Sequence, residues 1–162
     1  MMIGIDSEPK KEAESYAVPR VEISGAELLS ETAEFLDRHF KGLYDKATSD
    51  FIPRRITVYP VAFSVILKNI FKCVYAKDVI TVNCTNENVA MHFTLHFNTD
   101  LLTAEAKEKI RKIAKSVDMR IKEKDGAISI VFPYAMLGLA SIAPKLQRII
   151  YKSLVKYILS DN

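Results

Sequence analysis

Hydrophobic residues recur along this chain with two different periods, and the changes of period mark the predicted elements. Three segments carry apolar residues at every third or fourth position, which is typical of amphipathic helices. These segments cover residues 24–46, 60–76 and 103–117. Ser24, followed by Glu27, predicts a capping box at the start of the first helix. Pro60 suits the first turn of the second helix, because the N–H that proline lacks has no partner there.

Apolar and polar residues alternate in the segments between these helices, which predicts strands with one buried face. Alternating runs cover residues 54–59, 79–84, 91–97, 119–124 and 127–133. The last two runs flank Asp125-Gly126, and Asp-Gly between alternating runs is a strong hairpin signal. The order of elements predicts an α+β two-layer sandwich. We expect a mixed, mostly antiparallel sheet of about five strands with helices on one face.

The two ends of the chain differ from this central region. Residues 1–19 are polar and include Pro9 and Pro19, so we expect a flexible leader, followed by a folded domain at 20–133 and a C-terminal helical extension at 134–162. The extension carries an apolar stripe of Leu146, Ile150, Leu154, Tyr157 and Ile158 and a basic stripe of Lys145, Arg148, Lys152 and Lys156. We predict that the apolar stripe packs on its own domain. Contact with a membrane surface or with a partner is the alternative.

Composition excludes several classes of protein. The chain has 49% hydrophobic and 27% charged residues, which is typical of a soluble globular domain. A net charge of +3 is too mild to indicate a nucleic-acid partner. No apolar run is long enough to span a bilayer. Cys73 and Cys84 have no metal-binding spacing, and so few cysteines favour a reducing, cytoplasmic setting.

The residues that could perform chemistry form no catalytic or metal-binding pattern. His92 and His96 are four residues apart on a predicted strand, where they share a face but lie too far apart to share a metal ion. His39 is late in a predicted helix. The five glycines are not clustered, so no phosphate-binding loop is indicated. We therefore expect no catalytic residues, no metal ligands and exposed histidines.

The segment YPVAFSVILKNIFKC, residues 59–73, together with the helix before it, resembles the ATP-binding domain of sensor histidine kinases. This is the Bergerat fold, which gyrase, the heat-shock chaperone and anti-sigma-factor kinases share. The family motif runs Asp-Pro-x-x-Leu-x-x-Val-Leu-x-Asn-Leu-Leu-x-Asn-Ala. Tyr59 stands at the aspartate, Pro60 at the proline, Asn69 at the first asparagine and Cys73 at the second. The resemblance covers residues 20–133 and ends at Phe132-Pro133.

The departures from the family pattern lie at the positions that would hold ATP and Mg²⁺. In the family the second asparagine binds the magnesium ion, and Cys73 offers a soft sulfur instead of an oxygen. Phe97 or Thr99 stands where the family places an aspartate that binds adenine. Only four residues, Thr99 to Leu102, separate Asn98 from Thr103, where the family has a long glycine-rich lid. Asn69, Cys73, Phe97 and Thr99 are therefore expected to be vestigial positions that bind no cofactor.

The resemblance and these departures together predict a degenerate, pseudokinase-like domain. We expect it to act without catalysis as a protein-binding or regulatory module in bacterial signalling, with a protein partner or as a homodimer. The alternative is an ATP-binding kinase of the anti-sigma or sensor histidine kinase type. In that alternative Asn69 is the magnesium ligand and Asp100 is the adenine contact. A plain α+β domain of unrelated ancestry is the third possibility.

Overall fold

The computed structural model describes residues 16–39, 44–46, 55–135 and 144–160. In chain order the elements are β1 (Val21–Ser24), α2 (Gly25–His39), β2 (Tyr44–Lys46), β3 (Arg55–Val58), α3 (Pro60–Val74), β4 (Ile80–Asn86), β5 (Ala90–His96), the 3₁₀ helix η1 (Thr99–Leu101), α4 (Ala104–Ser116), β6 (Arg120–Lys124), β7 (Ala127–Pro133) and α5 (Pro144–Ser160). None of these helices is long and apolar enough to cross a bilayer.

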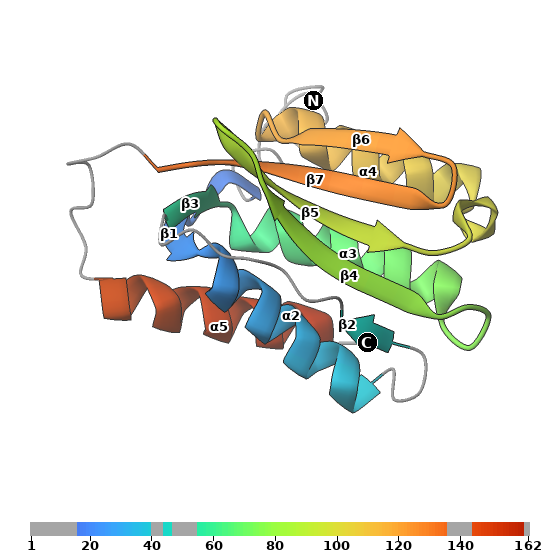
Figure 1. The fold of residues 1–162 in the computed structure, drawn as a ribbon, viewed down its shortest axis with the longest axis horizontal. Coiled ribbons are helices and arrows are strands. Elements are labelled where there is room, and N and C mark those ends of the chain that lie inside the picture. The colour runs from blue at the N-terminus through green and yellow to red at the C-terminus, as the bar shows by residue number, and fades with distance from the viewer. Residues whose placement is uncertain (1–15, 40–43, 47–54, 136–143, 161–162) are drawn as a thin grey trace, which may run out of the picture.

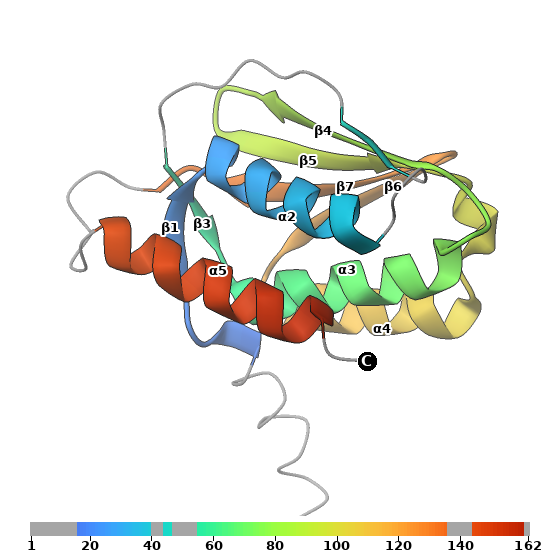
Figure 2. The ribbon, with the colours of Figure 1, turned by 90° about the horizontal axis from the view of Figure 1, so that it is seen from below.

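The main sheet has the strand order β2-β4-β5-β7-β6, with β2 parallel to β4 and every other neighbouring pair antiparallel. The helices lie together on one side of this sheet (Figures 1 and 2). This arrangement confirms the predicted α+β sandwich. One member of the sheet differs from the prediction. The strand at 55–58 pairs with β1 in a separate two-stranded sheet, and β2 is the fifth strand instead.

The first helix begins as predicted and ends earlier. The hydroxyl of Ser24 accepts a hydrogen bond from the backbone N–H of Glu27 at 3.1 Å, which caps the helix. The predicted helix to residue 46 is wrong, because α2 ends at His39 and Tyr44–Lys46 form β2. A parallel strand of three residues is too short for its own period to appear in the sequence.

The core fills the space between the inner face of the sheet and the helices. Phe63 of α3 lies edge-on against Phe93 of β5, at a ring distance of 5.4 Å, and against Phe132 of β7, at 5.3 Å. Phe71 of α3 stacks on Phe35 of α2. Edge-on and stacked pairs of this kind add to the hydrophobic stabilisation of burial. Helix α3 is therefore the centre of the packing.

The hairpin at Asp125-Gly126 forms where the sequence predicts it. Lys124 pairs with Ala127, and Gly126 has a φ of 79°, which favours glycine. The backbone of Gly126 also holds the end of β5, because Phe97 donates its N–H to the Gly126 carbonyl at 3.1 Å. The hairpin thus fixes both its own strands and the exit of β5.

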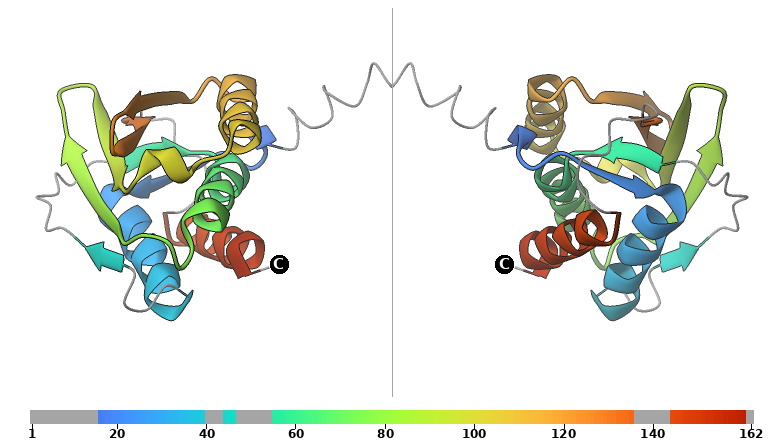
Figure 3. Two further views of the ribbon diagram at one scale, coloured as in Figure 1. Left: turned by 90° about the vertical axis from the view of Figure 1, so that its right-hand side faces the viewer. Right: turned by 90° about the vertical axis from the view of Figure 1, so that its left-hand side faces the viewer.

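Helix α5 packs on the domain as predicted, although a different face is buried. Its buried side chains are Gln147, Tyr151, Val155 and Leu159. Leu146 is 48% exposed and Tyr157 is 72% exposed, so the prediction that their stripe is the buried one is wrong. The reason is a backbone donor on β1: the N–H of Glu22 bonds to the side-chain oxygen of Gln147 at 2.7 Å, which fixes the rotation of the helix. Figure 3 shows α5 alongside α3.

Candidate functional site

Asn69 and Cys73 lie one turn apart on α3, as the sequence predicts, and both are partly buried. The amide nitrogen of Asn69 donates a hydrogen bond to the carbonyl of Val65 at 2.8 Å. This bond lies within the helix and uses the nitrogen of the amide, not its oxygen. Cys73 is a free thiol packed against the hydrophobic core.

Phe97, directly after β5, is part of the core and is only 5% exposed. Thr99 follows it at the start of η1, where its hydroxyl accepts a hydrogen bond from the backbone N–H of Gly126 at 3.3 Å. The aromatic ring of Phe97 therefore fills space under the sheet, while Thr99 fastens the chain to the β6–β7 hairpin.

The connection from β5 to α4 is short and is held by hydrogen bonds along its length. The carboxylate of Asp78 accepts a bond from the backbone N–H of Asn98 at 2.6 Å. Asn98 in turn caps η1 by accepting from the N–H of Asp100 at 3.1 Å. Thr103 caps α4 by accepting from the N–H of Ala106 at 3.0 Å. Leu102, between the two caps, is buried.

Asp78 is a residue of this region that the sequence alone did not point to. It precedes β4 and lies twenty residues from its partner Asn98. A lone aspartate before a strand carries no period and no motif, so no signal in the sequence indicated the contact. The structure brings Cys73, Phe97 and Leu102 to one hydrophobic core, and it places Asn69 on α3, which packs against α4.

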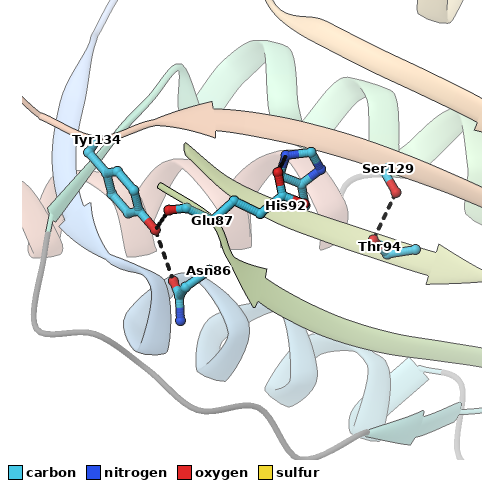
Figure 4. Close-up of polar contacts among 6 residues, drawn as sticks. All are labelled: Asn86, Glu87, His92, Thr94, Ser129 and Tyr134. Atoms are coloured by element: carbon cyan, nitrogen blue, oxygen red, sulfur yellow. Dashed lines mark hydrogen bonds and ion pairs between the residues drawn. The ribbon is translucent and has the colours of Figure 1, made fainter. Parts of the chain in front are cut away.

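The two histidines of β5 each have their own partner, and Figure 4 shows that of His92. The Nε2 of His92 lies 3.1 Å from a carboxylate oxygen of Glu87, and the Nε2 of His96 lies 2.9 Å from the side-chain oxygen of Asn83. The side chain of His92 is 12% exposed, so the prediction of an exposed histidine is wrong there, because the β4–β5 turn folds over it. His39 lies outside the side chains that the structure describes. Nowhere in the described ranges do three metal-binding side chains gather.

The turn that covers His92 is fastened to the end of β7. The hydroxyl of Tyr134 donates to the backbone carbonyl of Glu87 at 2.8 Å (Figure 4). On the face of β5 that carries His92, Thr94 shares a hydrogen bond of 2.8 Å with Ser129 of β7. These contacts join neighbouring strands, and such cross-strand pairs stabilise a sheet.

A pocket of about 150 Å³ lies between α2 and α5. Glu31 and Glu34 of α2 line one side, and Lys152 and Lys156 of α5 line the other. The positions that the resemblance singles out, Asn69, Cys73, Phe97 and Thr99, do not line this pocket.

Comparison with solved structures finds the same fold in histidine kinases. No family model and no curated protein matches the sequence. A histidine kinase from Burkholderia phymatum STM815 aligns with a TM-score of 0.54 at 11% identity, over 83% of this chain and 80% of that chain. The catalytic domain of the histidine kinase ThkA aligns with a TM-score of 0.50 at 13% identity, over 72% of this chain and 97% of that chain.

These alignments, which cover most of each domain, confirm the resemblance at the level of the fold. The chain has the fold of the histidine-kinase-like ATPases. ThkA has also been solved in complex with the response regulator TrrA, where this chain matches 48% of the longer kinase chain at a TM-score of 0.50 and 13% identity. Because fold and function are separable, the activity has to be argued from the site.

Proposed function

We propose that this chain is a non-catalytic member of the fold, which acts by binding another protein as a regulatory module in bacterial, cytoplasmic signalling. The observation that carries the proposal is the connection from β5 to α4. In the family this connection is a long lid that closes on the nucleotide phosphates. Here it is a few residues long, and Asp78, Asn98 and Thr103 fasten it with side-chain hydrogen bonds. A connection that is this short and is held by these hydrogen bonds cannot extend over a bound nucleotide.

The side chains at the vestigial positions support the same proposal. Magnesium is a hard cation that prefers oxygen ligands, and Cys73 offers sulfur. Phe97 is buried where the resemblance places the adenine-binding aspartate, so carbon fills that position. These residues do not fit a magnesium–nucleotide complex, and we derive no catalytic step from them.

One observation favours the alternative of an ATP-binding kinase with an altered site. The hydrogen bond from Asn69 to Val65 engages the amide nitrogen, so the amide oxygen is the atom that could bind magnesium. Asp100, to which the alternative assigns the adenine contact, is exposed on η1.

Titration of the full chain with ATP and Mg²⁺, followed by calorimetry and by thermal melting, tests the proposal. We expect no heat of binding and no shift in the melting temperature at millimolar ATP. A ligand at a hundred times its dissociation constant would stabilise the fold by about 2.7 kcal/mol. For a chain of this length each kcal/mol raises the melting temperature by about 2–4 °C. A magnesium-dependent shift of that size would overturn the proposal and favour the kinase.

A further inference from the structure

Helix α5 exposes a line of large apolar side chains on the surface of the molecule. Leu146 is 48% exposed, Ile149 is 52% exposed and Tyr157 is 72% exposed. Ile150 and Leu154, between them, are half-buried. We call these five residues the outer stripe. Their spacing of i, i+3, i+4, i+8 and i+11 keeps them on one side of a helix.

Leu146, Ile149 and Tyr157 of the outer stripe are exposed and contribute little to holding α5 on the domain. That task falls to the opposite side of the helix, where Tyr151 is completely buried and Val155 and Leu159 are nearly so. Gln147 adds its hydrogen bond to β1. Helix α5 is therefore apolar on two sides, and the most exposed members of the outer stripe are Leu146, Ile149 and Tyr157, while Ile150 packs against the edge of the core.

The charged residues of α5 itself and of the neighbouring helix α3 are all positive. Helix α5 carries Lys145, Arg148, Lys152 and Lys156 and has no carboxylate along its length. Helix α3, which packs beside it, carries Lys68 and Lys72 and likewise has no carboxylate. The acidic residues of the neighbouring α2, Glu31 and Glu34, lie across the α2–α5 pocket from Lys152 and Lys156.

From the spacing and the charges, we propose that the outer stripe of α5 is the docking surface for an amphipathic helix of a partner protein, with leucine-like residues on one face and carboxylates beside them. The inference rests on the proposed function and names its surface and its kind of partner. A row of anchors at helical spacing is the way in which helices bind in such complexes. Acidic flanks would complement the lysines and speed association.

The charges also argue against a second copy of the chain as the occupant. Two α5 helices packed stripe to stripe would bring Lys145 and Arg148 of each copy near cations of the other. Like charges across an interface oppose binding. An acidic helix meets the same apolar stripe without that repulsion.

Two synthetic amphipathic peptides provide the probe. They share a leucine face and differ only in the flanking residues, which are glutamate in one and lysine in the other. Binding to the full chain is measured by fluorescence anisotropy. We expect the glutamate peptide to bind and the lysine peptide not to bind. The Ile149→Glu and Tyr157→Ala variants should each weaken binding by about tenfold or more, which is 1.4 kcal/mol.

Val89→Glu is the matched control, because Val89 is 80% exposed and lies on the β4–β5 turn instead of on α5. It should bind the glutamate peptide like the unmodified chain, and melting curves establish that each variant folds. Absent binding, or equal binding of both peptides, would overturn the inference. A dimer that Ile149→Glu dissociates would assign the stripe to a second copy, and binding only to phosphatidylglycerol vesicles would assign it to a membrane surface. Either result would also overturn the inference.

The proposed function is tested separately, by the titration with ATP and Mg²⁺, so the two proposals can fail independently.

Discussion

At the scale of the residue, Gly126 and Ala76 are two of the three described positions with a positive φ, and Asp118 is the third. Gly126 has a φ of 79°, and Ala76, just after α3, has a φ of 62°. A methyl group at position 126 would meet only the carbonyl of Phe97 at 3.9 Å, so its cost comes from the backbone. We expect Gly126→Ala to lower the free energy of unfolding by about 1–2 kcal/mol. We expect Ala76→Gly to raise it by up to about 1 kcal/mol.

Urea denaturation of the two variants measures both effects. Because one change introduces the strain and the other removes it, the pair controls for general effects of glycine and alanine on the unfolded chain. If both variants changed the free energy of unfolding in the same direction, the strain of a positive φ would not explain the effect at one of the two positions.

Single residues also show how far the sequence predicts the candidate site. The placement of Asn69 and Cys73 one turn apart on a helix could be predicted, because helical periodicity is local. The contact between Asp78 and the N–H of Asn98 could not be predicted, since it depends on two segments meeting in three dimensions. The burial of His92 under the β4–β5 turn was missed for the same reason.

At the scale of the element, α5 depends on Tyr151, whose buried hydroxyl lies near the side chain of Thr32 and makes no hydrogen bond of normal geometry with the described residues. A buried hydroxyl without a partner lowers stability, so Tyr151→Phe should raise the free energy of unfolding by about 1 kcal/mol. Tyr151→Ala leaves a cavity and should lower it by about 3–5 kcal/mol. Thermal melting of both variants measures this. If Tyr151→Ala had the same melting temperature as the unmodified chain, α5 would not contribute to the core.

The same tyrosine predicts a dependence of stability on pH. Burial raises the pKa of the Tyr151 hydroxyl well above its ordinary value. The folded state thus disfavours the phenolate, so this stability is complete below the unfolded pKa and is lost as the pH rises above about 10. The unmodified chain should lose stability above that pH more steeply than Tyr151→Phe, by up to about 1.4 kcal/mol per pH unit. Parallel denaturation curves across this range would contradict the prediction.

Elements with a long periodic pattern or a clear turn signal were predicted well. The short strand β2 and the rotation of α5, a helix with two apolar sides, were not. Helices α3 and α4 and the β6–β7 hairpin follow local rules, namely period, caps and Asp-Gly. Strand β2 has three residues and pairs with a strand far along the chain, so no local pattern reports it. The rotation of α5 was missed because the helix has two apolar sides, and the choice between them depends on the bond between Gln147 and Glu22.

At the scale of the whole molecule, the proposed absence of nucleotide binding should not be reversible by one substitution. Cys73→Asn restores an oxygen ligand but leaves Phe97 buried and the β5–α4 connection short. We therefore expect Cys73→Asn to show no magnesium-dependent binding of ATP by calorimetry. If the unmodified chain did bind ATP and Asn69→Ala abolished it, Asn69 would be the metal ligand and the placement of the motif would be wrong by one turn.

The parallel pairing of β2 with β4 has a consequence for the order in which the sheet forms. Tyr44 pairs with Ile80 through a strand of three residues at the edge of the sheet, so we expect this contact to form late. Strands β4 and β5, and strands β6 and β7, pair across short loops, whereas β5 and β7 pair across α4 and β6, and β5 is paired on both sides. Amide protons of β2 should therefore exchange through local opening, while those of the central β5 should exchange only on global unfolding. Equal protection of both strands would mean that the sheet opens as a single unit.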